Sequence, residues 1–253
     1  MESNKQIFDG IFSLGAWCQV GSACRQRDFN VLSSPFHNFG VKRWQNVYEI
    51  LESRFKDYWE LENMTIGKLA ENYSTMYREK RMIYKVYCNK HYMVSNHHFD
   101  REDNKSTKLL TYEAFKEKID VLTEVFLAQC DQYETALFVC KVLSFPKRTE
   151  ISKEDILKFS EVLDKLRGGK PYQLRLAVPA RFYKKVLKWV EEENLTQVRI
   201  YPWRIAFNDD AFHEEWNTML NDVALADNHI ERLNYEIFGI TDPYSPHIDY
   251  LNS

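Results

Sequence analysis

The sequence is poor in glycine and proline, has no long hydrophobic run and carries almost no excess charge. Eight glycines and seven prolines among 253 residues exclude collagen-like and linker-rich chains. No stretch approaches the roughly 18 uninterrupted apolar residues of a membrane span, and the first residues lack the pattern of a signal peptide. A net charge of −3 leaves no basic footprint for nucleic acid. We therefore expect a cytoplasmic protein with neither a nucleic-acid nor a membrane partner.

The five cysteines form an odd set without a CxxC pair. This argues against a disulfide framework and a structural zinc site. The sequence also lacks the GxGxxG, P-loop, HExxH and GxSxG motifs. We therefore predict no metal, no cofactor and reduced thiols, of which Cys24, Cys130 and Cys140 belong to the core.

Aromatic residues are abundant instead, at 15% of the chain. Most of them fall at helical spacing, which is typical of core packing. A group of tyrosines within a predicted hairpin region does not fit such a stripe, and it could form one wall of a cleft for a peptide, a glycan or an acyl chain. These tyrosines are Tyr73, Tyr77, Tyr84, Tyr87 and Tyr92.

From residue 111 onward, predicted helices and strands alternate, which is the pattern of a parallel sheet covered by helices. We predict one α/β domain over residues 1–253, with three layers, a mainly parallel sheet, helices on both faces and an inserted β-hairpin region at 60–108. The hairpin itself is expected at 82–99, around Asn89 and Lys90. The expected strands are 8–14, 135–143, 174–178 and 197–201, and the expected helices are 17–27, 44–58, 112–130, 152–167, 181–193 and 211–221.

Cys18 follows the first predicted strand, which ends at Gly15. In parallel α/β sheets, ligands bind where the strands end and the next helices begin. A helix start lowers the pKa of a thiol, and its backbone amides can hold an oxyanion. The glycine allows a tight turn and a close approach of substrate. Cys18 is thus a candidate nucleophile, although a free cysteine is often simply a small buried side chain.

A cysteine nucleophile needs a base, and the base needs an orienting group. His97 and His98 follow the predicted hairpin, with Asp100 close behind. In an extended chain the two rings point to opposite faces, so only one of them can face Cys18. For the same reason the pair is a poor metal site.

The segments IFSLGAWCQVGSACRQRDF, SSPFHNF and VSNHHF resemble a family of uncharacterised bacterial proteins labelled papain-like cysteine peptidases. The family pattern has a strand ending in Leu-Gly, a Cys-Gln pair, a Pro-Phe-Asp-Trp motif and a downstream His-Asp-Phe. The resemblance implies that Cys18 is the nucleophile and His97 the base. The matching residues are Cys18, Gln19, Pro35, Phe36, His97 and Phe99.

The sequence departs from this pattern at three positions. His37 and Asn38 replace the Asp-Trp pair, and His98 replaces the aspartate of the last motif. If either aspartate orients the histidine in relatives, this chain must use another acid, and Asp100 or Asp103 is the nearest.

Papain-like enzymes also carry an oxyanion-binding glutamine before the cysteine, where this chain has none. Gln19 or backbone amides would have to fill that role. The candidate oxyanion and substrate residues are Gly15, Gln19, His37, Asn38 and His98.

Two alternatives stay open. In SGNH-type esterases a nucleophile also follows the first strand, and an Asp-x-x-His near the C-terminus completes the site. Asp210 and His213 fit that spacing, although Asp is also a routine helix cap. The second alternative is a non-catalytic protein that binds a glycan or a partner on the same fold. The leading prediction is a thiol-dependent hydrolase or acyl transferase acting on a small molecule, peptide or glycan, with no prediction of oligomeric state.

Overall fold

The computed structural model describes residues 5–15, 19–25, 27, 29, 34–36, 39–74, 79–95, 99, 112–143, 149–204 and 214–226. Side chains are not described at 22, 25 and 68–84. The elements are β1 (Gln6–Phe8), β2 (Gly10–Ser13), α1 (Gln19–Arg25), β3 (Phe39–Val41), α2 (Asn46–Glu52), the 3₁₀ helix η1 (Leu61–Asn63), β4 (Met64–Ser74), β5 (Glu79–Cys88), β6 (Met93–Ser95), α3 (Tyr112–Gln132), β7 (Ala136–Lys141), α4 (Lys153–Arg167), β8 (Tyr172–Pro179), α5 (Ala180–Glu192), β9 (Val198–Trp203), α6 (Glu214–Leu220) and β10 (Val223–Leu225).

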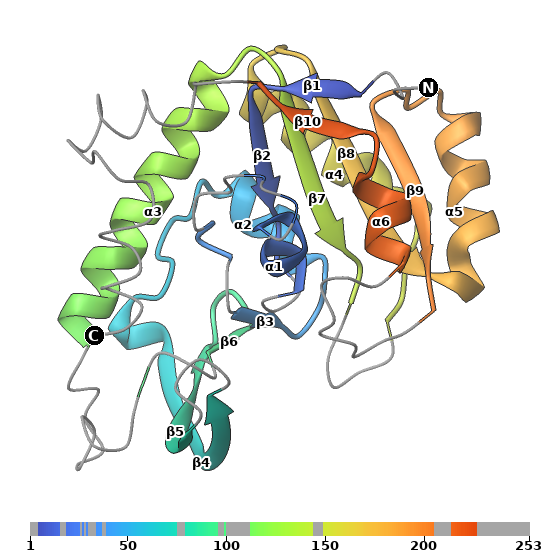
Figure 1. Cartoon of the computed structure of the whole chain (residues 1–253). Coiled ribbons are helices and arrows are strands. Elements are labelled where there is room, and N and C mark those ends of the chain that lie inside the picture. The colour runs from blue at the N-terminus through green and yellow to red at the C-terminus, as the bar shows by residue number, and fades with distance from the viewer. Residues whose placement is uncertain are drawn as a thin grey trace.

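A four-stranded parallel sheet in the order β2-β7-β8-β9 forms the centre of the fold (Figure 1). All six residues of β7 are buried, as its apolar sequence predicts for a central parallel strand. Helices α4 and α5 connect β7 to β8 and β8 to β9. The predicted α/β fold with a parallel sheet is therefore confirmed.

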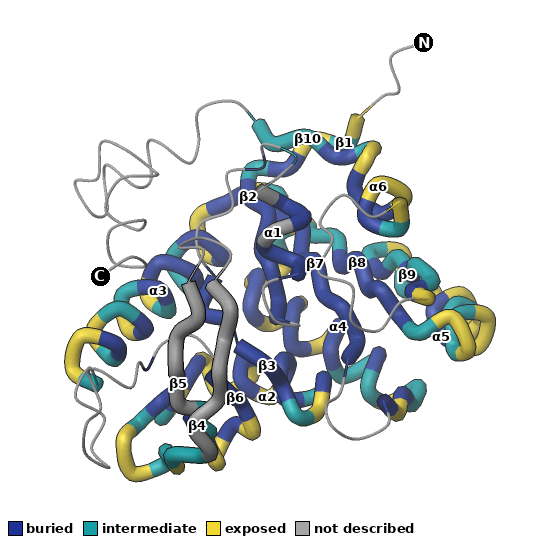
Figure 2. The backbone as a smooth tube through the Cα atoms, turned by 60° about the horizontal axis from the view of Figure 1, so that its bottom comes forward, coloured by how far each residue is buried: buried dark blue, intermediate teal, exposed yellow. Residues whose placement is uncertain are grey.

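Successive side chains of a strand point to opposite faces of the sheet, so alternate residues belong to two separate hydrophobic cores. Phe12 and Phe138 pack with residues of α2, α3, α4 and α5 on one face. Ile11 and Leu137 pack with α1 and α6 on the other. Helices thus cover both faces of the sheet, whose strands are buried along most of their length (Figure 2).

A second, antiparallel sheet in the order β3-β6-β5-β4 lies beside the parallel one (Figure 1). The predicted hairpin around Asn89 and Lys90 is confirmed, since β5 pairs with β6. The longer β4–β5 hairpin and the β3–β6 pair were not expected from the sequence. Neither was the short parallel pair of β1 with β10.

A capping box begins α4. The Ser152 hydroxyl accepts a hydrogen bond from the Asp155 N–H (3.2 Å), and the Asp155 carboxylate accepts one from the Ser152 N–H (2.9 Å). Gly168, with φ +58°, ends the helix in the left-handed conformation.

Two predicted boundaries are wrong. The helix expected over 44–58 ends at Glu52, and four of the following residues have positive φ, namely Arg54, Phe55, Asp57 and Trp59. This turn brings Phe55 and Trp59 into the core without a continuous helix. The strand expected over 8–14 is divided at Asp9, whose carboxylate accepts hydrogen bonds from the Thr135 N–H and hydroxyl (both 2.8 Å).

Candidate functional site

The chain turns sharply where β2 ends. The Leu14 N–H donates to the Val139 carbonyl (2.9 Å), which extends the pairing of β2 with β7. Gly15 then has a φ of +78°, a conformation that side-chain-bearing residues rarely adopt. A Cβ atom there would lie 3.5 Å from the nearest atom of Val47, so the backbone angle rather than crowding requires glycine. The tight turn predicted at Gly15 is present.

Gln19 begins α1 and is 4% exposed. Its Oε1 accepts a hydrogen bond of 2.6 Å from Nζ of Lys141, the last residue of β7, which is 2% exposed. Helix α1 has only seven residues, so its dipole is small. Lys141 brings a full positive charge to this end of the sheet, directly beside the start of α1.

Trp203, at the end of β9, completes this cluster. The Lys141 nitrogen lies 4.0 Å from the centroid of the Trp203 ring, which is the geometry of a cation–π contact. Trp203 in turn packs on Trp216 of α6, with ring centroids 4.6 Å apart. Gln19, Lys141 and Trp203 thus meet at the carboxyl end of the parallel strands.

Sequence reasoning missed Lys141 and Trp203. The signal for Lys141 was a single charged residue inside the apolar run TALFVCKVL. A lysine within a strand buried on both faces is costly unless it has partners, and it marks a special environment.

The Pro35-Phe36 motif packs beside the turn at Gly15. Phe36 is fully buried and contacts the Phe55 ring, with centroids 5.3 Å apart. The Tyr58 hydroxyl donates to the Pro35 carbonyl (2.9 Å), and burial raises the pKa of that tyrosine. This motif is therefore a packing element that supports the end of β2.

Phe99, the last residue of the third motif, is also buried. Its ring lies 4.7 Å from that of Phe115 on α3, and both belong to the core that contains Leu14 and Phe36. The three motif segments therefore converge on one core.

Most predicted site residues lie outside the described residues. Gly15 and Gln19 are brought together with the end of β7, as set out above. Nothing is assigned to the positions of Cys18, His37, Asn38, His97, His98, Asp100, Asp210 and His213, which are outside the described ranges. Their roles stay predictions.

The other four cysteines are buried in the core, which confirms the assignment of Cys24, Cys130 and Cys140. Burial raises the pKa of Cys140 to about 12 and also raises the pKa values of Cys88 and Cys130. These thiols are poor nucleophiles in the folded protein.

His91 is the one histidine among the described residues. It is 8% exposed, and its Nε2 lies 2.9 Å from the Lys56 carbonyl. Burial lowers the pKa of His91 below 6.5, so the unfolded chain binds this proton more readily than the folded one. Its contribution to stability is complete above pH 6.5 and is lost as the pH falls toward the folded-state pKa.

Between pH 7.5 and pH 5.5, we expect the free energy of unfolding to fall less in His91→Gln than in the wild type. The reason is that the variant has one fewer histidine to protonate on unfolding. Urea unfolding at the two pH values measures the difference. Equal losses in the two proteins would contradict a neutral, buried His91.

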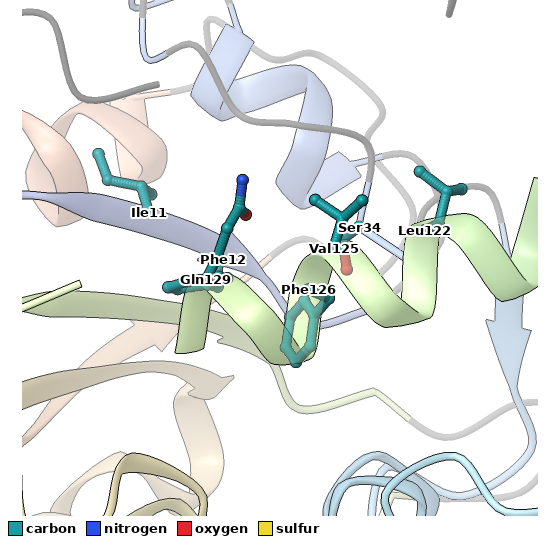
Figure 3. Close-up of a pocket in the computed structure, with 7 residues that line it drawn as sticks. All are labelled: Ile11, Phe12, Ser34, Leu122, Val125, Phe126 and Gln129. Atoms are coloured by element: carbon teal, nitrogen blue, oxygen red, sulfur yellow. The ribbon is translucent and has the colours of Figure 1, made fainter. Parts of the chain in front are cut away.

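A small recess lies between β2 and α3 (Figure 3). Gln129 lines it, and its buried Nε2 has no hydrogen-bond partner. The lining is otherwise mostly apolar, and it includes Ser34 next to the Pro35-Phe36 motif. The lining residues are Ile11, Phe12, Ser34, Leu122, Val125, Phe126 and Gln129.

Within the described ranges, no three His, Cys, Asp or Glu side chains gather as metal ligands would. A search of the same residues for a helix with the length and apolar character of a membrane span finds none.

The structure is that of an α/β protein in which Leu14-Gly15 follows β2 of the parallel sheet and lies beside a buried Pro35-Phe36 motif. The chain matches the family described as "Putative papain-like cysteine peptidase (DUF1796)" over residues 9–168. It belongs to that family, as the sequence motifs predicted. No curated protein and no solved structure matches it.

Proposed function

We propose that this protein is a thiol-dependent hydrolase or acyl transferase, with Cys18 as the nucleophile. Membership of a family described as cysteine peptidases supports this class of chemistry. The observation that carries the proposal is the buried Gln19–Lys141 pair at the carboxyl end of β2 and β7. Gln19 directly follows Cys18 in the sequence. Ligands of parallel α/β proteins bind at this end of the sheet.

The proposed reaction begins with transfer of the Cys18 proton to a histidine. The sulfur then bonds to a substrate carbonyl carbon, and the carbonyl electron pair moves to its oxygen. When the intermediate collapses, the leaving group takes the proton from the histidine. Water or another acceptor cleaves the resulting thioester and restores the thiol.

The hydrogen bond to Lys141 supports a role for the Gln19 amide in stabilising the charge that develops on the carbonyl oxygen. Its Oε1 accepts from Lys141, so Nε2 is the donating end of the amide. We assign Nε2 to the oxyanion, together with backbone amides. Gly15 leaves room for a substrate to approach the backbone.

We assign the base to His97, oriented by Asp100, with His213 and Asp210 as the alternative pair. His97→Ala and His213→Ala in the labelling assay below distinguish the two, since loss of the true base raises the pH at which Cys18 reacts. His37, Asn38 and His98 stay candidate substrate contacts, and a peptide, a glycan or a small acyl compound is the proposed substrate.

The test is the pH dependence of thiol labelling. We expect iodoacetamide to modify Cys18 well below pH 7, and to modify Cys18→Ala hardly at all while it is folded. The background is low because the other four cysteines are buried, and burial raises the pKa of three of them.

The matched control is Cys24→Ala, which removes a core cysteine and leaves Cys18 in place. It should keep the full early labelling. If wild-type Cys18 reacts only near the pH of an ordinary thiol, about 8.5, the nucleophile is ruled out.

A non-catalytic binding protein is the second candidate, and one surface feature favours it. On the antiparallel sheet, the Lys42 nitrogen lies 5.1 Å from the Tyr87 ring centroid and 5.9 Å from that of Tyr92. Tyr92 is 48% exposed, so an aromatic face with a positive charge is presented to solvent. The side chains of Tyr73, Tyr77 and Tyr84, expected to share this surface, lie outside the described residues. Normal thiol reactivity at Cys18 would favour this function.

A further inference from the structure

Lys141 is an uncommon residue at its position. It ends a strand whose six residues are all buried, and it retains only 2% of its exposure. An ammonium in such a place is strongly disfavoured unless polar groups replace its water. The described partners are the side-chain amide oxygen Oε1 of Gln19 and the face of the Trp203 ring, and both interact favourably with an ammonium.

The other charged side chains on this face of the sheet have partners of their own. Arg175 pairs with Asp222 at 2.6 Å, and Asp222 also lies 3.4 Å from Arg199. Glu215 accepts a hydrogen bond from the backbone N–H of Arg204 (3.0 Å). The remaining titratable side chains described on α1, α6 and β9 are Cys24, Glu214 and Tyr201, and Arg27 and Arg204 follow α1 and β9.

The connection to the proposed nucleophile is short. The Lys141 ammonium donates a hydrogen bond to the end of the Gln19 side chain, and that side chain leads to the backbone of residue 19. Cys18 is the preceding residue in the sequence. A positive charge close to a thiol favours the thiolate and lowers its pKa.

We infer that Lys141 is a positioning residue for the proposed Cys18 site, which it serves in two ways through the Gln19–Lys141 pair. It fixes the Gln19 amide with Nε2 as the donating end, and its buried charge stabilises negative charge beside residue 19. The inference rests on the proposed function and adds to it the group that makes the thiol reactive.

The test compares the pH at which Cys18 is half-maximally labelled by iodoacetamide in the wild type and in Lys141→Met. We expect the midpoint of the variant to lie about one pH unit higher, which is a roughly tenfold lower labelling rate on the acidic limb. Far-ultraviolet circular dichroism at each pH shows that the variant is folded.

Lys118→Met is the matched control. It removes a half-buried lysine of α3. Because burial lowers the pKa of Lys118 to about 8, this lysine carries its full positive charge only below that pH, and the two variants are compared on the acidic limb. The wild-type midpoint is expected for this variant.

A second variant covers the case in which Lys141→Met does not fold. Gln19→Glu keeps nearly the same shape and places a carboxylate against the Lys141 ammonium, which adds one negative charge to the pair. Its Cys18 midpoint should also rise, by at least as much as in Lys141→Met.

The outcomes separate the two proposals. Early labelling in the wild type with unchanged midpoints in both folded variants overturns the role of Lys141 and leaves Cys18 as the nucleophile. Late labelling in the wild type overturns the proposed function itself. Early labelling in the wild type with raised midpoints in the variants supports both.

Discussion

Replacing Arg167 with methionine is expected to lower the free energy of unfolding by about 3 kcal/mol. The Arg167 side chain is 2% exposed and donates hydrogen bonds to the backbone carbonyls of Cys130, Tyr133 (2.7 Å) and Glu134 (3.2 Å). These carbonyls lie where α3 ends, so no further helical turn satisfies them. Methionine keeps much of the apolar stem but has no donor, which leaves several buried acceptors without partners. Urea unfolding should show a lower midpoint at an unchanged m-value.

Lys165→Met in the same last turn of α4 is the control. The Lys165 side chain is 63% exposed and pairs only with Glu161 at the surface, so its loss should change stability by no more than about 0.5 kcal/mol. Arg167→Lys should fall between the two, because one ammonium cannot replace a planar fork that reaches several carbonyls. A loss for Arg167→Met as small as that for Lys165→Met would show that these hydrogen bonds contribute little.

The parallel half of the fold was predictable because its elements carry strong local signals. The residues of β7 are apolar on both faces, which is what a central parallel strand requires. The start of α4 is encoded by Ser152 and Asp155, and its end by Gly168. Each of these signals lies within the element that it defines.

The short strands and the end of α2 were not predictable in the same way. β1, β3 and β10 have three residues each, and they are strands only because partners distant in the sequence pair with them. Residues Phe55 and Tyr58 follow a helical period, but the positive φ of Phe55 turns the chain after Glu52. Burial of large aromatic side chains outweighed local helix propensity there.

One part of the candidate site, the turn at Gly15, could be predicted from the sequence, and the contacts of Lys141 could not. Gly15 could be recognised because a glycine after a buried strand often permits a turn with positive φ. Lys141 could not be assigned a partner, since Gln19 and Trp203 lie far from it in sequence and meet it only through strand order. The apolar residues on both sides of Lys141 in the sequence nevertheless indicated that it would be buried.

Replacing Trp44 with alanine is expected to destabilise the protein by about 3–5 kcal/mol. Trp44 is fully buried, and its indole N–H donates to the Glu150 carbonyl (2.8 Å). Its ring packs against those of Tyr48 (5.8 Å) and Phe159 (6.2 Å), which lie on α2 and α4. The substitution therefore leaves a cavity between these two helices and removes the shorter of the two hydrogen bonds to the Glu150 carbonyl, which keeps the one from Gln45 Nε2 (3.5 Å). Thermal or urea unfolding followed by circular dichroism measures the loss.

The effect should extend to the end of β2, because α2 carries Val47, the nearest neighbour of Gly15 on that side. A less stable fold exposes buried thiols more often, so Trp44→Ala should also raise the slow labelling of Cys88 and Cys140 by iodoacetamide. Trp189→Ala is the matched control, since that ring is only partly buried on α5, and it should cost clearly less. Equal losses for the two tryptophans would show that α2 and α4 do not depend on Trp44 for their packing, and that the Gly15 turn is supported from elsewhere.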